Sequence, residues 1–197
     1  MTIIIALMSL VLLSAFSTSL IVVMNTDVRA SANYAASREA MYAADGALNI
    51  TARELQAAAD WNTLLARGAL SAFVDGPPTG ARPVGDGNSV DLAQATQAVN
   101  DEPRPWGTNN PVWRLFGYGW IGPRTYVIAW IADDGSENDG DASIDGGGAA
   151  NPGAGILAVR AEAFGVGGGH KVLEATVRRE VDEGGSLVRV VSWQEIR

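Results

Sequence analysis

The sequence contains no cysteine and a single histidine, His170. The missing cysteines exclude disulfide bonds, thiolate metal sites and a cysteine nucleophile, so packing or a metal ion must hold the folded part together. No GxSxG or HExxH signature occurs, and His170 stands beside a triple glycine with no motif around it, which is typical of a turn or surface residue. These absences predict that the protein is not an enzyme.

Basic residues are also scarce. The chain of 197 residues has 14 Lys and Arg against 22 Asp and Glu, a formal net charge of −8. Nucleic-acid binding demands a basic surface, so we expect no nucleic-acid partner. The acidic balance suits solubility outside a cell and the binding of cations.

Charge, glycine and proline are all missing from residues 1–24. As a helix rising about 1.5 Å per residue, this stretch would reach roughly 36 Å, enough to cross a hydrocarbon layer of about 30 Å. Its apolar residues surround the helix instead of forming one stripe, which suits lipid or the interior of a helix bundle. We therefore predict a transmembrane or bundled helix over 1–24.

The residues on either side of this helix help to distinguish a secretory signal, a membrane anchor and a helix that follows a removed leader. A cleavable secretory signal needs a basic segment before the apolar run, and none is present. An ordinary membrane anchor usually carries flanking Lys or Arg, whereas the first charges here are Asp27 and Arg29, one of each sign. A leader that carried the basic flank and has been removed would explain both observations, with Met1 as the first mature residue.

Alanine dominates residues 25–67, which contain no proline and only one glycine. Because alanine is the strongest helix former, we expect the first helix to continue to residue 67, with a bend or local unwinding at the hydroxyl-rich segment 14–19. One apolar stripe has spacings of three and four residues: Ala44, Leu48, Ala52, Leu55 and Ala59. The polar residues that lie mostly off it are Arg38, Asp45, Asn49, Arg53 and Asp60. Residues 25–67 should thus be an amphipathic helix that packs on a head.

Residues 37–48 (SREAMYAADGAL) lie within the predicted helical part of the chain, after the apolar segment. The segment resembles the one that follows the apolar helix in PilX-type minor pilins of the type IV pilin superfamily. That resemblance implies a leader removed by a prepilin peptidase, a helix held first in the inner membrane and then in a filament core, and a β-rich head outside. Most pilins have a glutamate as the fifth mature residue, whereas this chain has Ile5, so assembly would rest on apolar packing.

The resemblance also assigns partners and a location. The partners would be copies of this chain or other pilins in a helical filament, with the inner membrane before assembly and an extracellular pilus afterwards. The filament-core helix would present Met1, Ile3, Ile4, Ile5, Leu7, Leu10, Leu13, Phe16 and Leu20. The alternative is a single-span, membrane-anchored ectodomain that binds a ligand or calcium without polymerising.

Residues 68–197 change in composition and predict a β-rich head. Five runs have the residue pattern of strands: 112–118, 125–132, 156–164, 171–181 and 187–196. Glycine-containing turns separate several of them and suit antiparallel hairpins. Residues 89–99 fit a helix or a strand equally well. The expected fold is α+β: an antiparallel β-meander of four or five strands with one face covered by the amphipathic half of the long helix.

An acidic, glycine-rich loop spans residues 133–155. Carboxylates this close repel one another, and Ca²⁺ is the obvious neutraliser because it takes six to eight oxygens on flexible loops. The candidate calcium ligands are Asp133, Asp134, Asp139, Asp141 and Asp145. The match to an EF-hand is poor, no cofactor is required, and composition slightly favours a solvated acidic loop over a calcium site.

Aromatic residues crowd the segment 106–130: Trp106, Trp113, Phe116, Tyr118, Trp120, Tyr126 and Trp130. A sugar-binding or adhesive platform is one interpretation. Packing in the core or at a subunit interface is favoured, because large rings dominate burial in small domains.

Overall fold

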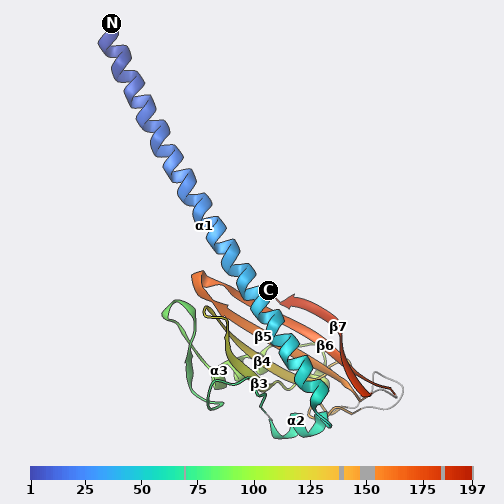
Figure 1. Cartoon of the computed structure of the whole chain (residues 1–197). Coiled ribbons are helices and arrows are strands. Elements are labelled where there is room, and N and C mark those ends of the chain that lie inside the picture. The colour runs from blue at the N-terminus through green and yellow to red at the C-terminus, as the bar shows by residue number, and fades with distance from the viewer. Residues whose placement is uncertain (69, 138–139, 147–153, 183–184, 197) are drawn as a thin grey trace.

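The computed structural model describes residues 1–68, 70–137, 140–146, 154–182 and 185–196. One long helix projects from a β-rich head, and its second half lies across that head (Figure 1). The helices are α1 (Thr2–Ala57), α2 (Trp61–Arg67) and α3 (Leu92–Asp101). The strands are β1 (Ala81–Pro83), β2 (Ser89–Asp91), β3 (Arg114–Ile121), β4 (Thr125–Asp133), β5 (Ile156–Gly165), β6 (His170–Asp182) and β7 (Gly185–Ile196), with a short 3₁₀ segment η3 (Val166–Gly168) between β5 and β6. The predicted α+β class is confirmed.

Helix α1 runs without interruption from Thr2 to Ala57, so the local unwinding expected at residues 14–19 does not occur. The hydroxyl of Thr18 donates a hydrogen bond of 2.9 Å to the carbonyl of Ser14, one turn earlier. A hydroxyl that is satisfied inside its own helix leaves the backbone ladder intact. The result is a straight rod, as Figure 1 shows.

The helix ends ten residues earlier than its composition predicts, at Ala57 instead of residue 67. Ala58 adopts an extended conformation (φ −77°, ψ 127°), and α2 then begins with Asp60 as its N-cap. Trp61 is fully buried, and its indole N–H donates to the carbonyl of Leu55 at 2.9 Å. Burial of this large ring and the cap at Asp60 together outweigh the helix propensity of the alanines.

Five antiparallel strands form a meander in the order β3-β4-β5-β6-β7, as the sequence predicts. β4 pairs with β5 over the full length of β4, from Thr125 with Gly165 to Asp133 with Leu157. Strands β1 and β2 form a separate two-stranded sheet. Residues 89–99 form both structures that their pattern allowed, a short strand and then α3, because Asp91 caps the helix by accepting hydrogen bonds from two backbone N–H groups.

One face of the sheet packs against the second half of α1. The helix residues buried there are Ala36, Ala40, Ala43, Ala44, Ala47, Leu48, Thr51 and Leu55. Of the predicted stripe, Ala44, Leu48 and Leu55 are buried, Ala52 is partly buried, and Ala59 lies exposed beyond the helix end. The small alanines let the helix approach the strands closely, so the packing prediction is confirmed except at that last position.

The other face carries a second core under α3 and the loops before β3. Five of the seven clustered aromatics are buried: Trp113, Tyr118, Tyr126 and Trp130 in this second core, and Phe116 in the core beneath α1. Trp106 and Trp120 keep 48% and 38% of their surface exposed. The core role predicted for this cluster is confirmed for its buried members. Strand β4, with a core on each side, is buried along its whole length.

Candidate functional site

The first functional feature is the projecting part of α1, which we call the rod (residues 1–35). Every residue of the rod is exposed. Its best stretch of 18 residues has a mean hydropathy of 2.3, and the helix is long and apolar enough to cross a membrane. All residues assigned to the filament core or membrane lie on the rod and face solvent: Met1, Ile3, Ile4, Ile5, Leu7, Leu10, Leu13, Phe16 and Leu20.

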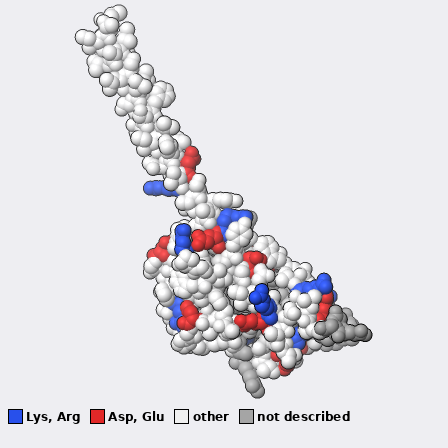
Figure 2. All heavy atoms as spheres, viewed as in Figure 1, with Lys and Arg blue, Asp and Glu red and all other residues white. Residues whose placement is uncertain are grey.

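The rod is apolar on all sides over residues 1–24. Figure 2 shows its surface white over most of its length, with charged residues only in the part nearer the head. The first of these are Asp27 and Arg29. Exposed apolar surface costs about 25 cal/mol per Å² relative to a dry environment, so a surface of this kind needs lipid or other protein around it.

The second feature is a group of three buried carboxylates, Asp133, Glu137 and Asp145, which we call the acidic cluster. One oxygen from each lies within 4.8 Å of the others. Exposure is 2% for Asp133, 2% for Glu137 and 8% for Asp145. Asp133 ends β4 and Glu137 follows in the next turn. The cluster thus forms at one end of the sheet.

Asn62 of α2 positions Asp145 with its side-chain amide. The amide donates to the Asp145 carbonyl at 3.0 Å and accepts from the Asp145 backbone N–H at 2.6 Å. The N–H of Gly155, just before β5, donates to Asp145 Oδ1 at 2.6 Å. These bonds connect the cluster to α2, which lies at the end of the head far from the N-terminus (Figure 1).

Within the part of the chain that the structure describes, the negative charges of the acidic cluster are not balanced by positive charges close by. Burial, together with the carboxylate of Glu137, raises the pKa of Asp133 to about 8. Burial also raises the pKa of Asp145, against the opposing effects of the Gly155 N–H and of Arg179. The Arg179 guanidinium donates its hydrogen bonds to backbone carbonyls at the end of α1 and lies 4.2 Å from the centre of the Trp61 ring. Among the described residues, Oδ1 of Asp133 has no hydrogen-bond partner.

Two of the five predicted calcium ligands, Asp133 and Asp145, belong to the acidic cluster. Asp134 instead accepts hydrogen bonds from Ser136, and Asp141 is exposed and accepts from Ser143. Asp139 lies outside the described residues.

Glu137, which the predicted ligand set omitted, is the third member of the acidic cluster. The set comprised five aspartates of the acidic loop, and Glu137 lies in the same loop. The signal that could have found it is its position four residues after Asp133, close behind a buried strand.

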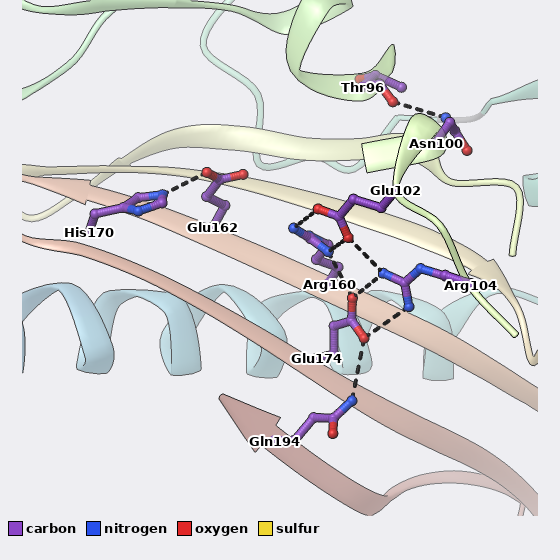
Figure 3. Close-up of polar contacts among 9 residues, drawn as sticks. All are labelled: Thr96, Asn100, Glu102, Arg104, Arg160, Glu162, His170, Glu174 and Gln194. Carbon is purple, nitrogen blue, oxygen red and sulfur yellow. Dashed lines mark hydrogen bonds and ion pairs between the residues drawn. The ribbon is translucent and has the colours of Figure 1, made fainter. Parts of the chain in front are cut away.

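The head also contains a network of paired charges on the sheet face opposite α1 (Figure 3). Arg104 forms two hydrogen bonds with Glu174, at 2.6 and 3.2 Å. Arg160 bonds Glu174 at 2.9 Å and Glu102 at 2.7 Å. Burial opposes the charged form of Glu174, but the hydrogen bond and charge of Arg104 and the charge of Arg160 hold its pKa below the usual value. Two cations matched by two carboxylates indicate a structural role, which joins the segment before β3 to β5 and β6.

His170 starts β6, and its Nε2 lies 2.6 Å from Glu162. Half of its side chain is exposed, as expected for a surface residue. Both residues line a hollow of about 460 Å³ beside the charge network.

No protein-family model, curated protein or solved structure matches this chain.

Proposed function

We propose that this protein is a structural subunit of a type IV pilus or a pilus-like filament. The observation that carries the proposal is the rod: residues 1–35 are all exposed, are helical from Thr2 onward, are apolar on all sides over residues 1–24 and continue into the part of α1 that packs on the head. Segment 37–48, with its resemblance to PilX-type minor pilins, supports the same assignment.

The continuity of α1 supports assembly because it fixes the head relative to the rod. A straight helix with no break between Thr2 and Ala57 transmits the position of the rod directly to the sheet. Copies that packed their rods side by side would therefore bring their heads into a regular outer wall. A flexible linker between the two parts would give no such order.

The gain on assembly must come from packing, because lipid already shields the rod before assembly. Helices that associate out of lipid gain van der Waals contacts rather than hydrophobic transfer energy. Because residue 5 is Ile rather than the Glu of most pilins, residues 1–24 carry no side-chain charge that would oppose or guide the transfer of the helix from lipid into the filament. The proposed partners are copies of this chain or related pilins, the inner membrane holds the subunit before assembly, and the role is not catalytic.

The second candidate is a single-span, membrane-anchored ectodomain that does not polymerise. Its support is the length of the apolar helix, which fits one bilayer crossing, followed by the polar segment 25–33 at the depth of the lipid headgroups. Both candidates share the membrane-inserted state and differ in what the rod contacts afterwards.

The test is a cysteine cross-linking experiment in cells that assemble pili, which is clean because the chain has no cysteine of its own. We expect the Leu13→Cys variant to form disulfide-linked dimers, one bond for each pair of thiols, in sheared extracellular filaments, which electron microscopy would show at pilus width. The Asn49→Cys variant, exposed on the head part of α1, is the control for random collisions.

A monomeric Leu13→Cys chain confined to the membrane fraction would overturn the proposal and support the ectodomain. Equal cross-linking of both variants in membranes would contradict it as well. Mass spectrometry of the amino terminus adds an independent readout, since a methylated Met1 behind a removed leader is expected for a pilin.

A further inference from the structure

We propose that the acidic cluster of Asp133, Glu137 and Asp145 is a binding site for a calcium ion in the head. This inference goes beyond the filament function and does not depend on it. The site lies at the end of the sheet that contacts α2, far from the rod.

The first support is the unpaired oxygen of Asp133. This residue is 98% buried, and among the described residues its Oδ1 accepts no hydrogen bond. The carboxyl group of Asp133 is hydrogen-bonded to the Glu137 side chain and to the Asp134 backbone, but an oxygen of a buried carboxylate that lacks a partner costs free energy unless a cation takes that place. The oxygens of two further carboxylates within 4.8 Å identify where that cation would sit.

The second support is the charge balance around the cluster. Three carboxylates gather in the interior. Arg179 is the cation that influences Asp145, but its guanidinium donates hydrogen bonds to the backbone carbonyls of Ala58 and Ala59. A divalent ion between the carboxylates would compensate two negative charges at once. The network around Glu174 shows the contrasting solution in the same head, with an arginine for each carboxylate.

The ligand atoms of the cluster indicate which kind of metal ion it would bind. All three side chains offer oxygen, and the chain has no cysteine. Asp133 pairs with Leu157 at one end of β5, whereas His170 pairs with Phe164 near the other end, so the single histidine is far from the cluster. Hard oxygen ligands favour calcium or magnesium over zinc or copper. Oxygens that share a calcium ion at about 2.4 Å are separated by at most about 4.8 Å, and calcium tolerates the irregular geometry of a loop better than magnesium does.

The ion would tie three parts of the head together. Asp133 belongs to β4, Asp145 is bonded to α2 through Asn62, and Gly155 leads into β5. Calcium binding should therefore stabilise the connection between β4 and β5 and its contact with α2. A head without disulfides gains most from such a clamp.

The experiment uses the full chain in detergent micelles, stripped with a chelator and then titrated with calcium chloride at pH 7.5. We expect one saturable site by calorimetry and a rise in the thermal midpoint of at least about 5 °C at saturation. Magnesium at the same concentration should give less than half of that rise. An absence of both heat and thermal shift up to millimolar calcium would overturn the proposal, because the carboxylates would then share a proton instead.

Two variants locate the site. Asp133→Asn should abolish the calcium-dependent shift, whereas Asp141→Asn, an equal change of charge at an exposed carboxylate of the same loop, should retain it. Equal loss in both variants would also overturn the proposal. We expect Asp133→Asn to fold without calcium, since an amide has nearly the shape of the carboxyl group and introduces no charge into the interior.

A terbium experiment tests the site without a variant of the ligands. The Trp106 ring packs against Gly135, between Asp133 and Glu137 in the chain, so it lies close enough to sensitise a bound lanthanide. Terbium emission excited through tryptophan should appear on binding, be displaced by calcium and fall at least twofold in Trp106→Phe. Emission that calcium does not displace would contradict a calcium site.

Discussion

At the residue scale, Glu174 illustrates how the head accommodates buried charge. Its carboxylate, which keeps only 10% of its side-chain surface exposed, is bonded by both Arg104 and Arg160. Removing the charge of Glu174 would leave Arg104 and Arg160 to share the single carboxylate of Glu102 in a poorly solvated place. We expect Glu174→Gln to lower the free energy of unfolding by about 3 kcal/mol at pH 7.

The same residue gives a prediction for pH. Because the pKa of Glu174 in the folded head lies below its ordinary value of 4.5, its contribution to stability is present above that value. The contribution is lost as the pH falls through the lower, folded pKa. Urea unfolding of the full chain in detergent at pH 3 to 7 should show a steep acid-side loss that Glu174→Gln reduces.

The control for this measurement is Glu180→Gln, whose carboxylate pairs with Arg189 at the exposed surface. Surface pairs contribute little, so this variant should keep the acid-side slope of the original chain. An acid-side slope unchanged in Glu174→Gln would show that the network does not contribute through this carboxylate.

At the element scale, the sequence predicted the strands better than the end of the helix. Each of the five meander strands lies within a few residues of its predicted range, because apolar runs and glycine turns act locally. The break after Ala57 depends on Trp61, which must reach a core built by distant strands. Local propensity contains no information about that contact.

The acidic cluster was only half predictable for the same reason. Composition identified Asp133 and Asp145 as candidate ligands but not Glu137, because the turn after β4 decides which carboxylates turn inward. Asn62 of α2 then fixes Asp145 from 83 residues away. The pairing of Arg104 and Arg160 with Glu174 likewise joins segments that no spacing in the sequence connects.

A matched pair of glycines tests the close approach of α1 to the sheet. A Cβ added at Gly169, beyond η3, would lie 2.6 Å from the backbone oxygen of Ala36, so helix and turn would have to separate. We expect Gly169→Ala to lower the free energy of unfolding by about 1–3 kcal/mol. The measurement is chemical unfolding of the full chain in detergent.

Gly46→Ala is the control in the same helix. Its Cβ would meet only Cδ1 of Ile121, at an ordinary contact distance of 3.5 Å. Alanine is a better helix former than glycine by about 0.5–1 kcal/mol, so this variant should be more stable than the original chain. Equal effects of the two substitutions would contradict the close packing described for Ala36.

At the scale of the whole molecule, the chain divides into a rod with an exposed apolar surface, which needs lipid or other protein around it, and a head that supplies its own core. Helix α1 belongs to both, since its burial begins only at Ala36. In the proposed filament the rod therefore provides cohesion, and the head provides the outer surface with its acidic character. The calcium site, at the far end of the head, would act on the stability of the head and leave the rod unchanged.

This division predicts the effect of truncation. Removing residues 1–28 deletes the apolar surface but none of the buried residues of α1. The shortened chain should remain in solution without detergent, unfold within about 2 °C of the full chain and keep its calcium response. Removing residues 1–43 also deletes the buried Ala36, Ala40 and Ala43, so that chain should unfold at a clearly lower temperature. If the shorter deletion destabilised the head as much as the longer one, the rod would have to contribute to folding, and its exposure would have no special meaning for assembly.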